Sequence, residues 1–127
     1  MIETTSFRNL KPDNYDYVFA IVRFMKPMPG IRQLQVLSPD WDLFHTYRKL
    51  VAQDNWNTDT FETIYKPRFI TQIKQDHDAM RWLDRLCNGD AKGCRIALAC
   101  FCQDKTLCHR SIVANMLKSL NAQIIYN

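Results

Sequence analysis

The amino-acid sequence predicts a single-domain α/β fold with a mostly parallel sheet, and two observations lead to this prediction. Short apolar runs alternate along the chain with segments in which apolar residues recur at helical spacing, the pattern of strands joined by crossover helices. Two runs, residues 17–24 and 94–102, are apolar almost throughout, as expected for strands buried on both faces of a parallel sheet. We therefore expect a three-layer, Rossmann-like sandwich that comprises residues 1–127 as one domain.

Composition narrows the protein classes that fit the chain. With 127 residues, of which 46% are hydrophobic, the chain suffices for one core and not for two ordinary domains. It contains no apolar run long enough to span a bilayer, and its start lacks the order of a signal peptide, so we expect a cytoplasmic protein without membrane contact. The net charge of +4 permits a phosphate-bearing partner without requiring one. Most aromatic residues have spacings that favour core packing over base stacking.

The first half of the chain is predicted to contain two strands and a helix. The strand candidates are residues 2–7 and 17–24. The prolines and the glycine of residues 26–30 then interrupt regular structure, and we expect a loop as far as about Val36. Ser38, which a proline follows, is expected to cap a helix that ends near Val51.

The second half is predicted to alternate between helices and strands. The expected helices are residues 58–74, 76–88 and 111–120, and the expected strands are residues 94–102 and 122–126. Pro67 must kink the first of these helices or begin a new turn in it, because proline lacks the backbone N–H that a helix interior uses. Asp76 is expected to cap the next helix, and Asn88 with Gly89 to stop it.

The stretch from Cys100 to Arg110 combines the residue types that carry chemistry. Side chains two apart on a strand share a face, so Cys100 and Cys102 should converge at the carboxyl end of the strand, where open α/β sheets bind ligands. A short turn then brings Cys108, His109 and Arg110 to the start of a helix. Because the chain lacks an export signal, its five cysteines are expected to be reduced thiols.

A helix start favours anions, and this predicts distinct roles for the last three of these residues. The helix dipole should lower the pKa of Cys108, which becomes a candidate nucleophile. His109 can move a proton near neutral pH, and Arg110 can clamp an anion. If Arg8 and Arg23 also lie at strand ends, they would complete an anion pocket with Arg110.

Other sites fit the same residues less well. A tyrosine-phosphatase loop requires an arginine six residues after its cysteine, and Cys108 stands there relative to Cys102. The stretch contains no glycine, so neither a P-loop nor a dinucleotide motif is present. A metal site remains a possibility, because Cys100, Cys102, Cys108 and His109 offer up to four ligands for zinc or iron. A Cys-x-Cys pair on a buried strand, however, binds metal less readily than the more widely spaced cysteine pair of a zinc knuckle.

At these residues the sequence resembles domain-of-unknown-function family 488. The hallmark of that family is an apolar strand that ends in cysteine, a seven-residue stretch, and Cys-His-Arg at the start of a helix, and Cys100 and Cys108 occupy the two cysteine positions without gaps. Weaker matches are Thr4, Thr5 and Ser6 for a Thr/Ser-bearing first strand, Arg23 for the arginine of an Asp-x-Arg motif, and Trp56, Phe61 and Tyr65 for a Trp, Phe, Tyr pattern.

The sequence departs from that family at two positions. Cys102 stands where many relatives have an acidic residue, and Ile21 stands where the aspartate of the Asp-x-Arg motif would be. An acid–base role of those carboxylates therefore does not carry over to this chain. The resemblance implies a compact α/β fold, a Cys-His-Arg pocket and a bacterial or phage origin, and it implies no particular reaction.

The leading functional hypothesis is a small enzyme-like domain, without a cofactor, that binds a phosphate-bearing ligand such as a nucleotide or a nucleic acid. The candidate catalytic residues are Cys108 and His109, and the candidate ligand-binding residues are Arg110, Arg23, Thr5, Ser6 and Cys102. The alternative is a non-catalytic module that binds zinc or iron, interacts with a protein or sequesters a ligand, as a phage factor could. The candidate metal ligands of that alternative are Cys100, Cys102, Cys108 and His109.

Overall fold

Five parallel strands form one sheet in the order β3-β2-β4-β1-β5. The computed structural model describes residues 1–102 and 104–127. The strands are β1 (Ile2–Ser6), β2 (Tyr17–Ala20), β3 (Ile31–Gln33), β4 (Ile96–Cys100) and β5 (Ile124–Tyr126). Every neighbouring pair is parallel, so the predicted α/β class with a parallel sheet is confirmed.

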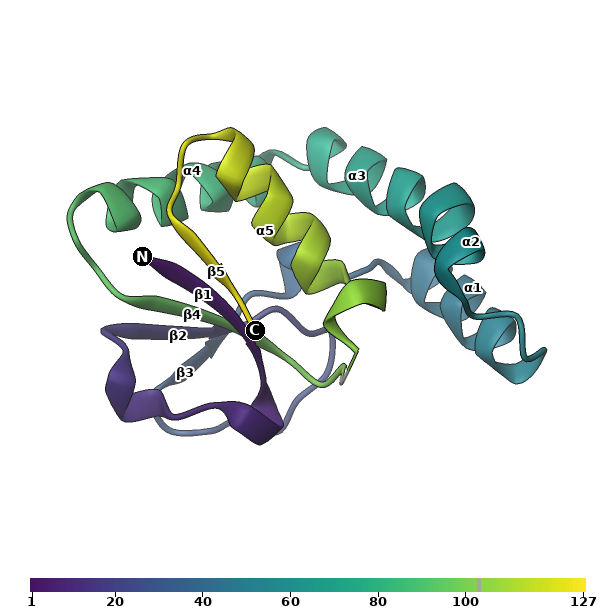
Figure 1. Ribbon diagram of the computed structural model, residues 1–127, viewed down its shortest axis with the longest axis horizontal. Helices are drawn as coiled ribbons and strands as arrows, with labels where there is room; N and C mark the ends of the chain where they lie inside the picture. The colour runs from purple at the N-terminus through teal and green to yellow at the C-terminus, as the bar shows by residue number, and fades with distance from the viewer. Residues whose placement is uncertain (103) are drawn as a thin grey trace.

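Helices cover one face of this sheet and extend beyond its carboxyl edge. The helices are α1 (Trp41–Ala52), α2 (Thr58–Thr60), α3 (Lys66–Gln75), α4 (His77–Ala91) and α5 (His109–Ser119). Figure 1 shows α4 and α5 on one side of the sheet, the segment between β1 and β2 on the other side, and α1 and α2 beyond the strand ends. No helix in the described part of the chain combines the length and the apolarity that crossing a membrane requires.

Strand β4 lies at the centre of the sheet and is shorter than predicted. All five of its residues are buried, as expected for an inner strand of a parallel sheet. Its ladder ends at Cys100, which pairs with Ser6, the last residue of β1. The prediction of a strand over residues 94–102 is therefore wrong at both ends, and Cys94 and Cys102 lie outside it.

Strand β2 is also shorter than its apolar sequence predicted. The Ile21 N–H still donates to the Ala99 carbonyl oxygen, at 2.9 Å, but β4 ends one residue later. Beyond this point the side-chain amide of Gln33 donates to the carbonyl oxygens of Val22 and Arg23, at 3.0 and 2.9 Å. A side chain thus replaces the strand partner, and the backbone of residues 22–23 leaves the sheet.

The edge strand β3 lies inside the segment that was predicted to be a loop. It is three residues long and pairs with β2 from Ile31 to Gln33. A strand of this length is too short to show an alternation of apolar and polar residues. Its partner strand, rather than its own sequence pattern, makes it a strand.

Two helix boundaries differ from the predictions for physical reasons. The residue that caps α1 is Asp40, whose carboxylate accepts the Leu43 N–H at 2.8 Å, whereas the predicted cap, Ser38, donates its hydroxyl to the Gln35 carbonyl oxygen. Asp76 caps α4 as predicted, but the helix continues through Gly89 to Ala91. A Cβ at Gly89 would lie 3.0 Å from the Cδ1 atom of Ile96, so this glycine allows α4 to approach β4 closely.

The chain accommodates Pro67 with a π-helical turn. Residues Phe61–Tyr65 form this turn between α2 and α3, and Pro67 then lies in the first turn of α3, where its missing N–H has no role in the helix. The turn directs Phe61 and Tyr65 into the core, where their rings are stacked 5.7 Å apart. Of the two alternatives predicted at Pro67, a kink or a new turn, the structure shows the second, as α3 begins there after a change of helix type.

We expect Leu98→Ala to destabilise the fold strongly. Leu98 is fully buried at the centre of β4, and removing its side chain leaves a cavity that costs about 2–5 kcal/mol of the free energy of unfolding. Leu120→Ala, at a leucine that is 44% exposed, is the matched control, with an expected loss of about 0.5 kcal/mol. Urea unfolding measures both, and equal losses would contradict the central place of β4.

Candidate functional site

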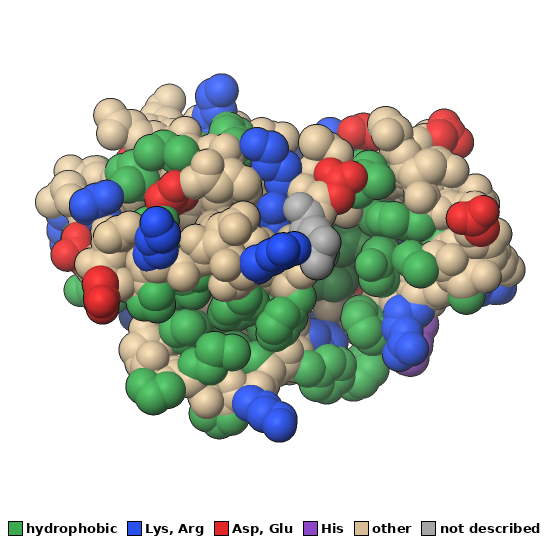
Figure 2. Space-filling model, turned by 60° about the horizontal axis from the view of Figure 1, so that its bottom comes forward, with side chains coloured by type: hydrophobic (Ala, Val, Ile, Leu, Met, Phe, Trp, Pro, Cys, Tyr) green, Lys and Arg blue, Asp and Glu red, His purple; other side chains and the backbone are tan. Residues whose placement is uncertain are grey.

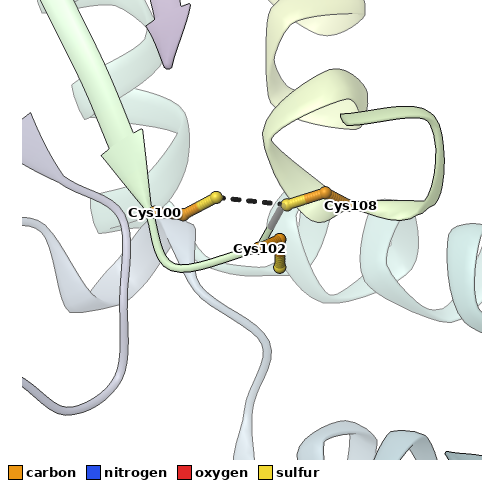
Figure 3. Close-up of side chains that lie close together, drawn as sticks. All are labelled: Cys100, Cys102 and Cys108. Atoms are coloured by element: carbon orange, nitrogen blue, oxygen red, sulfur yellow. Dashed lines mark hydrogen bonds between the residues drawn. The ribbon is translucent and has the colours of Figure 1, made fainter. Parts of the chain in front are cut away.

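Three cysteines meet at the carboxyl end of β4. Cys100 ends this strand, Cys102 lies in the turn that follows, and Cys108 precedes α5 as its N-cap residue. The three Sγ atoms lie within 4.8 Å of one another, and the Sγ atoms of Cys100 and Cys108 point toward each other at 3.2 Å (Figure 3). The predicted convergence of Cys100 and Cys102 occurs, but it is the turn and not a shared strand face that brings Cys102 to the cluster.

The guanidinium of Arg110 ties this turn to α5. Arg110 is 2% exposed, and its Nη1 atom donates to the Cys100 Sγ atom at 3.2 Å and to the Cys102 carbonyl oxygen at 2.6 Å. These two bonds fix the relative positions of the strand end and the helix start. They also place a permanent positive charge beside a thiol, which stabilises the thiolate form.

Of the three sulfurs, Cys100 and not Cys108 is the one whose surroundings favour a thiolate. The S–H groups of Cys102 and Cys108 donate to the Cys100 sulfur, and with Arg110 they hold the pKa of Cys100 well below its usual range, although burial opposes this effect. The hydrogen bond to Cys100 raises the pKa of Cys102 to about 12. Burial, reinforced by the contact with Cys100, raises the pKa of Cys108. The predicted lowering of the Cys108 pKa by the helix start is therefore wrong, because burial of Cys108 and its hydrogen bond with Cys100 outweigh the helix dipole.

His109 extends the chain of polar contacts from Cys108 to β2. Its Nε2 atom lies 2.5 Å from the Ile21 carbonyl oxygen, and its Nδ1 atom lies 3.7 Å from the Cys108 Sγ atom. A carbonyl oxygen can only accept, so Nε2 carries a proton, and the Nδ1 atom on the other side of the ring faces the Cys108 thiol. The edge of the buried ring also packs against Phe69. The position of the ring is therefore fixed on several sides.

An aromatic cavity of about 370 Å³ opens beside this cluster. Cys102, Cys108 and His109 form one wall of it, and Arg23 is the cationic residue of its lining. The remaining wall is mostly aromatic and comprises Phe24, Phe44, Tyr47, Trp56, Tyr65 and Phe101. Figure 2 shows a hollow bordered by hydrophobic side chains between the body that contains the sheet and the part formed by α1 and α2.

The predicted ligand-binding residues divide between this cavity and a second, polar cleft. Arg23 and Cys102 border the aromatic cavity, whereas Arg110 and Thr5 border the polar cleft on the other side of the 100–108 turn. Ser6 borders neither of the two, and its carbonyl oxygen accepts the Thr5 hydroxyl at 3.2 Å. The exposed Arg8 borders neither as well, so the structure does not assemble the predicted pocket of three arginines.

The aromatic wall was not predicted to belong to the site. Apart from Phe24 and Phe101, its residues come from α1, from residue 56 and from the π-helical turn, which are far in sequence from Cys108. The density of aromatic residues between Trp41 and Tyr65 is the signal that could have indicated a cavity rather than core packing. Which of these rings face a cavity depends on how α1 and α3 approach the turn after β4.

The fold and the site define a class of protein: a small parallel α/β domain with a thiol cluster at the end of its central strand and a His-Arg pair at the start of the next helix. The chain belongs to the DUF488 family. The family model DUF488-N3a, described as the active DUF488-N3 subclade, matches residues 7–121. No curated protein and no solved structure matches the chain.

We expect chelator-treated protein to show the ultraviolet absorbance of a thiolate at neutral pH, and Cys100→Ser to remove it. The hydrogen bonds with Cys102 and Cys108, together with the guanidinium, favour the charge on the Cys100 sulfur. Cys87→Ser is the control, because burial raises the pKa of Cys87 and keeps it protonated. An absorbance that persists in Cys100→Ser would assign the thiolate to another sulfur.

Proposed function

We propose that this chain is a small enzyme-like domain that binds a phosphate-bearing ligand, a nucleotide or a nucleic-acid end, in the aromatic cavity. Cys108 and His109 carry the chemistry, and Arg23 and Cys102 contact the ligand. Arg110 acts through Cys100 as a positioning residue on this side of the turn. The observation that supports the proposal best is that a sulfur and an imidazole, 3.7 Å apart, line the same aromatic cavity.

The geometry of Cys108 suits a thiol that is activated only when a ligand binds. Its sulfur lies between the Cys100 sulfur, at 3.2 Å, and the Nδ1 atom of His109, at 3.7 Å. One S–H proton thus faces two acceptors. Transfer of this proton to Nδ1 yields a nucleophilic sulfur and an imidazolium whose Nε2–H remains bonded to the Ile21 carbonyl oxygen.

The lining of the cavity suits a planar ligand that carries an anion. Phe44, Tyr47 and Trp56 offer ring faces and edges of the kind on which nucleobases stack. Arg23 provides a cation beside these rings, held by the hydrogen bond from its Nε atom to the Pro39 carbonyl oxygen at 2.6 Å. The description of the matching family model as an active subclade is also consistent with a catalytic role.

We expect nucleoside monophosphates to protect the cavity thiols from alkylation, which is measured at alkaline pH because the pKa values of Cys102 and Cys108 are raised. The alkylation rate at Cys102 and Cys108, located by mass spectrometry, should fall about tenfold at a ligand concentration near ten times the dissociation constant. Phe24→Ala, at an exposed ring of the lining, should weaken this protection. Cys87 serves as the internal control, since it lies outside the cavity.

Cys108→Ser separates a catalytic role from sequestration. The variant keeps the size of the side chain, so a nucleotide should still raise its melting temperature. Any conversion of a nucleotide or nucleic-acid end that the wild-type protein catalyses should cease, because the sulfur of Cys108 is gone. Thiols that stay inert until the protein unfolds, with no protection by any nucleotide, would contradict the proposal.

A metal centre is the second candidate function, because the three sulfurs already lie within 4.8 Å of one another. Zinc–sulfur bonds of about 2.3 Å hold thiolates slightly closer than this, so small side-chain shifts would suffice. The three cysteines form the cluster without His109, whose Nε2 atom is occupied by the Ile21 carbonyl oxygen. A bound zinc or iron would supply Lewis-acid or structural chemistry at the wall of the cavity, with a coordination position left for a ligand.

If the cluster is a metal centre, protein purified without added metal should contain zinc or iron at close to one equivalent by elemental analysis. Cys100→Ser and Cys108→Ser should lose most of the metal, because two sulfurs hold it far less firmly than three. Cys87→Ser should keep it, as this cysteine lies outside the cluster. If the wild-type protein contains no metal and binds no zinc on titration, this candidate function is ruled out.

A further inference from the structure

A second opening, a polar cleft of about 780 Å³, lies on the other side of the 100–108 turn. Its lining comes from β1, from the segment between β1 and β2, from residues 104–106 and the start of α5, and from Arg95 and Asn127 beside β4 and β5. The proposed ligand of the aromatic cavity does not use it. The residues of this polar cleft are Glu3, Thr5, Asn9, Lys11, Asn14, Tyr15, Arg95, Asp104, Lys105, Thr106, Arg110 and Asn127.

Part of this lining lies at a position in the fold where ligands commonly bind. Strands β1 and β4 are neighbours in the sheet, and the segments that follow them leave to opposite sides, the segment of residues 7–16 below the sheet and α5 above it (Figure 1). A parallel sheet opens a crevice where two adjacent connections diverge in this way. Thr5, near the end of β1, and Arg110, at the start of α5, both border the polar cleft.

The charges of the polar cleft favour an anion. Four cationic side chains, Lys11, Arg95, Lys105 and Arg110, face two carboxylates. The carboxylates already have neutral partners: Glu3 accepts from the Tyr15 hydroxyl and the Asn127 amide, and Asp104 accepts from the Thr106 N–H and hydroxyl. Within residues 1–102 and 104–127, none of the four cations forms an ion pair.

A buried donor without a partner points to what the cleft binds. The Nε–H of Arg110 is buried and has no hydrogen-bond partner among the described residues, although Nη1 of the same guanidinium has two. A donor of this kind is costly to leave unpaired, since guanidinium N–H groups bond strongly to water when they are exposed. Arg110 borders the polar cleft, so a bound oxyanion is the partner that would satisfy it.

We infer that the polar cleft is a separate binding site for a phosphate group, with Arg110 as its buried anchor and Lys11 and Lys105 as its exposed cations. The site is independent of the ligand in the aromatic cavity. Arg110 thus contacts the thiol cluster through Nη1 and also borders the cleft that the phosphate would occupy. Binding of phosphate in the cleft and the position of Cys100 are coupled through one guanidinium.

The probe for this inference is pyrophosphate, titrated by calorimetry at low ionic strength. Wild-type protein should bind one equivalent. The double variant Lys11→Ala/Lys105→Ala, which removes two exposed side chains and leaves Arg110 in place, should bind about tenfold more weakly, because charge-assisted contacts to phosphate are lost.

The matched control is Lys49→Ala/Lys74→Ala, at two exposed lysines of α1 and α3 that lie outside the polar cleft. It changes the net charge by the same amount, so its affinity for pyrophosphate should stay within about twofold of wild type if the site is specific. No binding by wild-type protein, or an equal weakening in both double variants, would overturn the inference. An equal weakening would show that pyrophosphate binds through the net charge of the protein and not at a defined site.

The two sites can be tested apart. Phe24→Ala should weaken the protection of Cys102 and Cys108 by nucleotides and leave pyrophosphate binding unchanged, because Phe24 lines only the aromatic cavity of the two. If pyrophosphate binds and nucleotides give no protection, the cleft site holds and the proposed function fails. If nucleotides protect and pyrophosphate does not bind, the proposed function holds and the cleft site fails.

Discussion

The hydrogen bonds of one guanidinium hold the end of the central strand to the start of the last helix. Arg110 reaches back from α5 to the Cys100 sulfur and the Cys102 carbonyl oxygen. Strand pairing ends at Cys100, so it does not hold the turn that follows β4. The hydrogen bonds of Arg110 hold this turn in the position that brings the three sulfurs together. A thiolate stabilised in a buried place requires a fixed cation, and the guanidinium of Arg110 is the cation that contacts Cys100. The site and its local fold therefore depend on each other.

The turn also separates two environments of opposite character. On one side lies an aromatic cavity bordered by Cys108 and His109, and on the other a polar cleft bordered by lysines and arginines. Strand β4 is buried on both faces, so its end at Cys100 cannot shift without disturbing the core. Chemistry at the cavity and anion binding at the cleft would thus both take place beside the end of β4.

The sequence pattern predicted the elements well where their own residues decide them, and poorly where a neighbour does. Asp76 caps α4 as predicted because the cap is a local bond to the next turn. Gly89 does not end that helix. A glycine is present there because a side chain at this position would meet Ile96 where α4 packs on β4. Strand β3 was not predicted, because its pairing with β2, and not a pattern in its own residues, makes this segment a strand. Each difference arises from a contact between segments distant in sequence.

The order of residues alone was sufficient to establish the α/β class and to locate the candidate site between Cys100 and Arg110, because apolar runs report burial and a strand-to-helix turn reports where parallel sheets bind. Tertiary packing decided which sulfur bears the charge, which arginine borders which opening and which aromatic rings enclose the cavity. These properties follow from distances of a few ångströms between α1, α5 and the end of β4. Periodicity along the chain carries no information on such distances, since it records which side chains are buried and not what they touch.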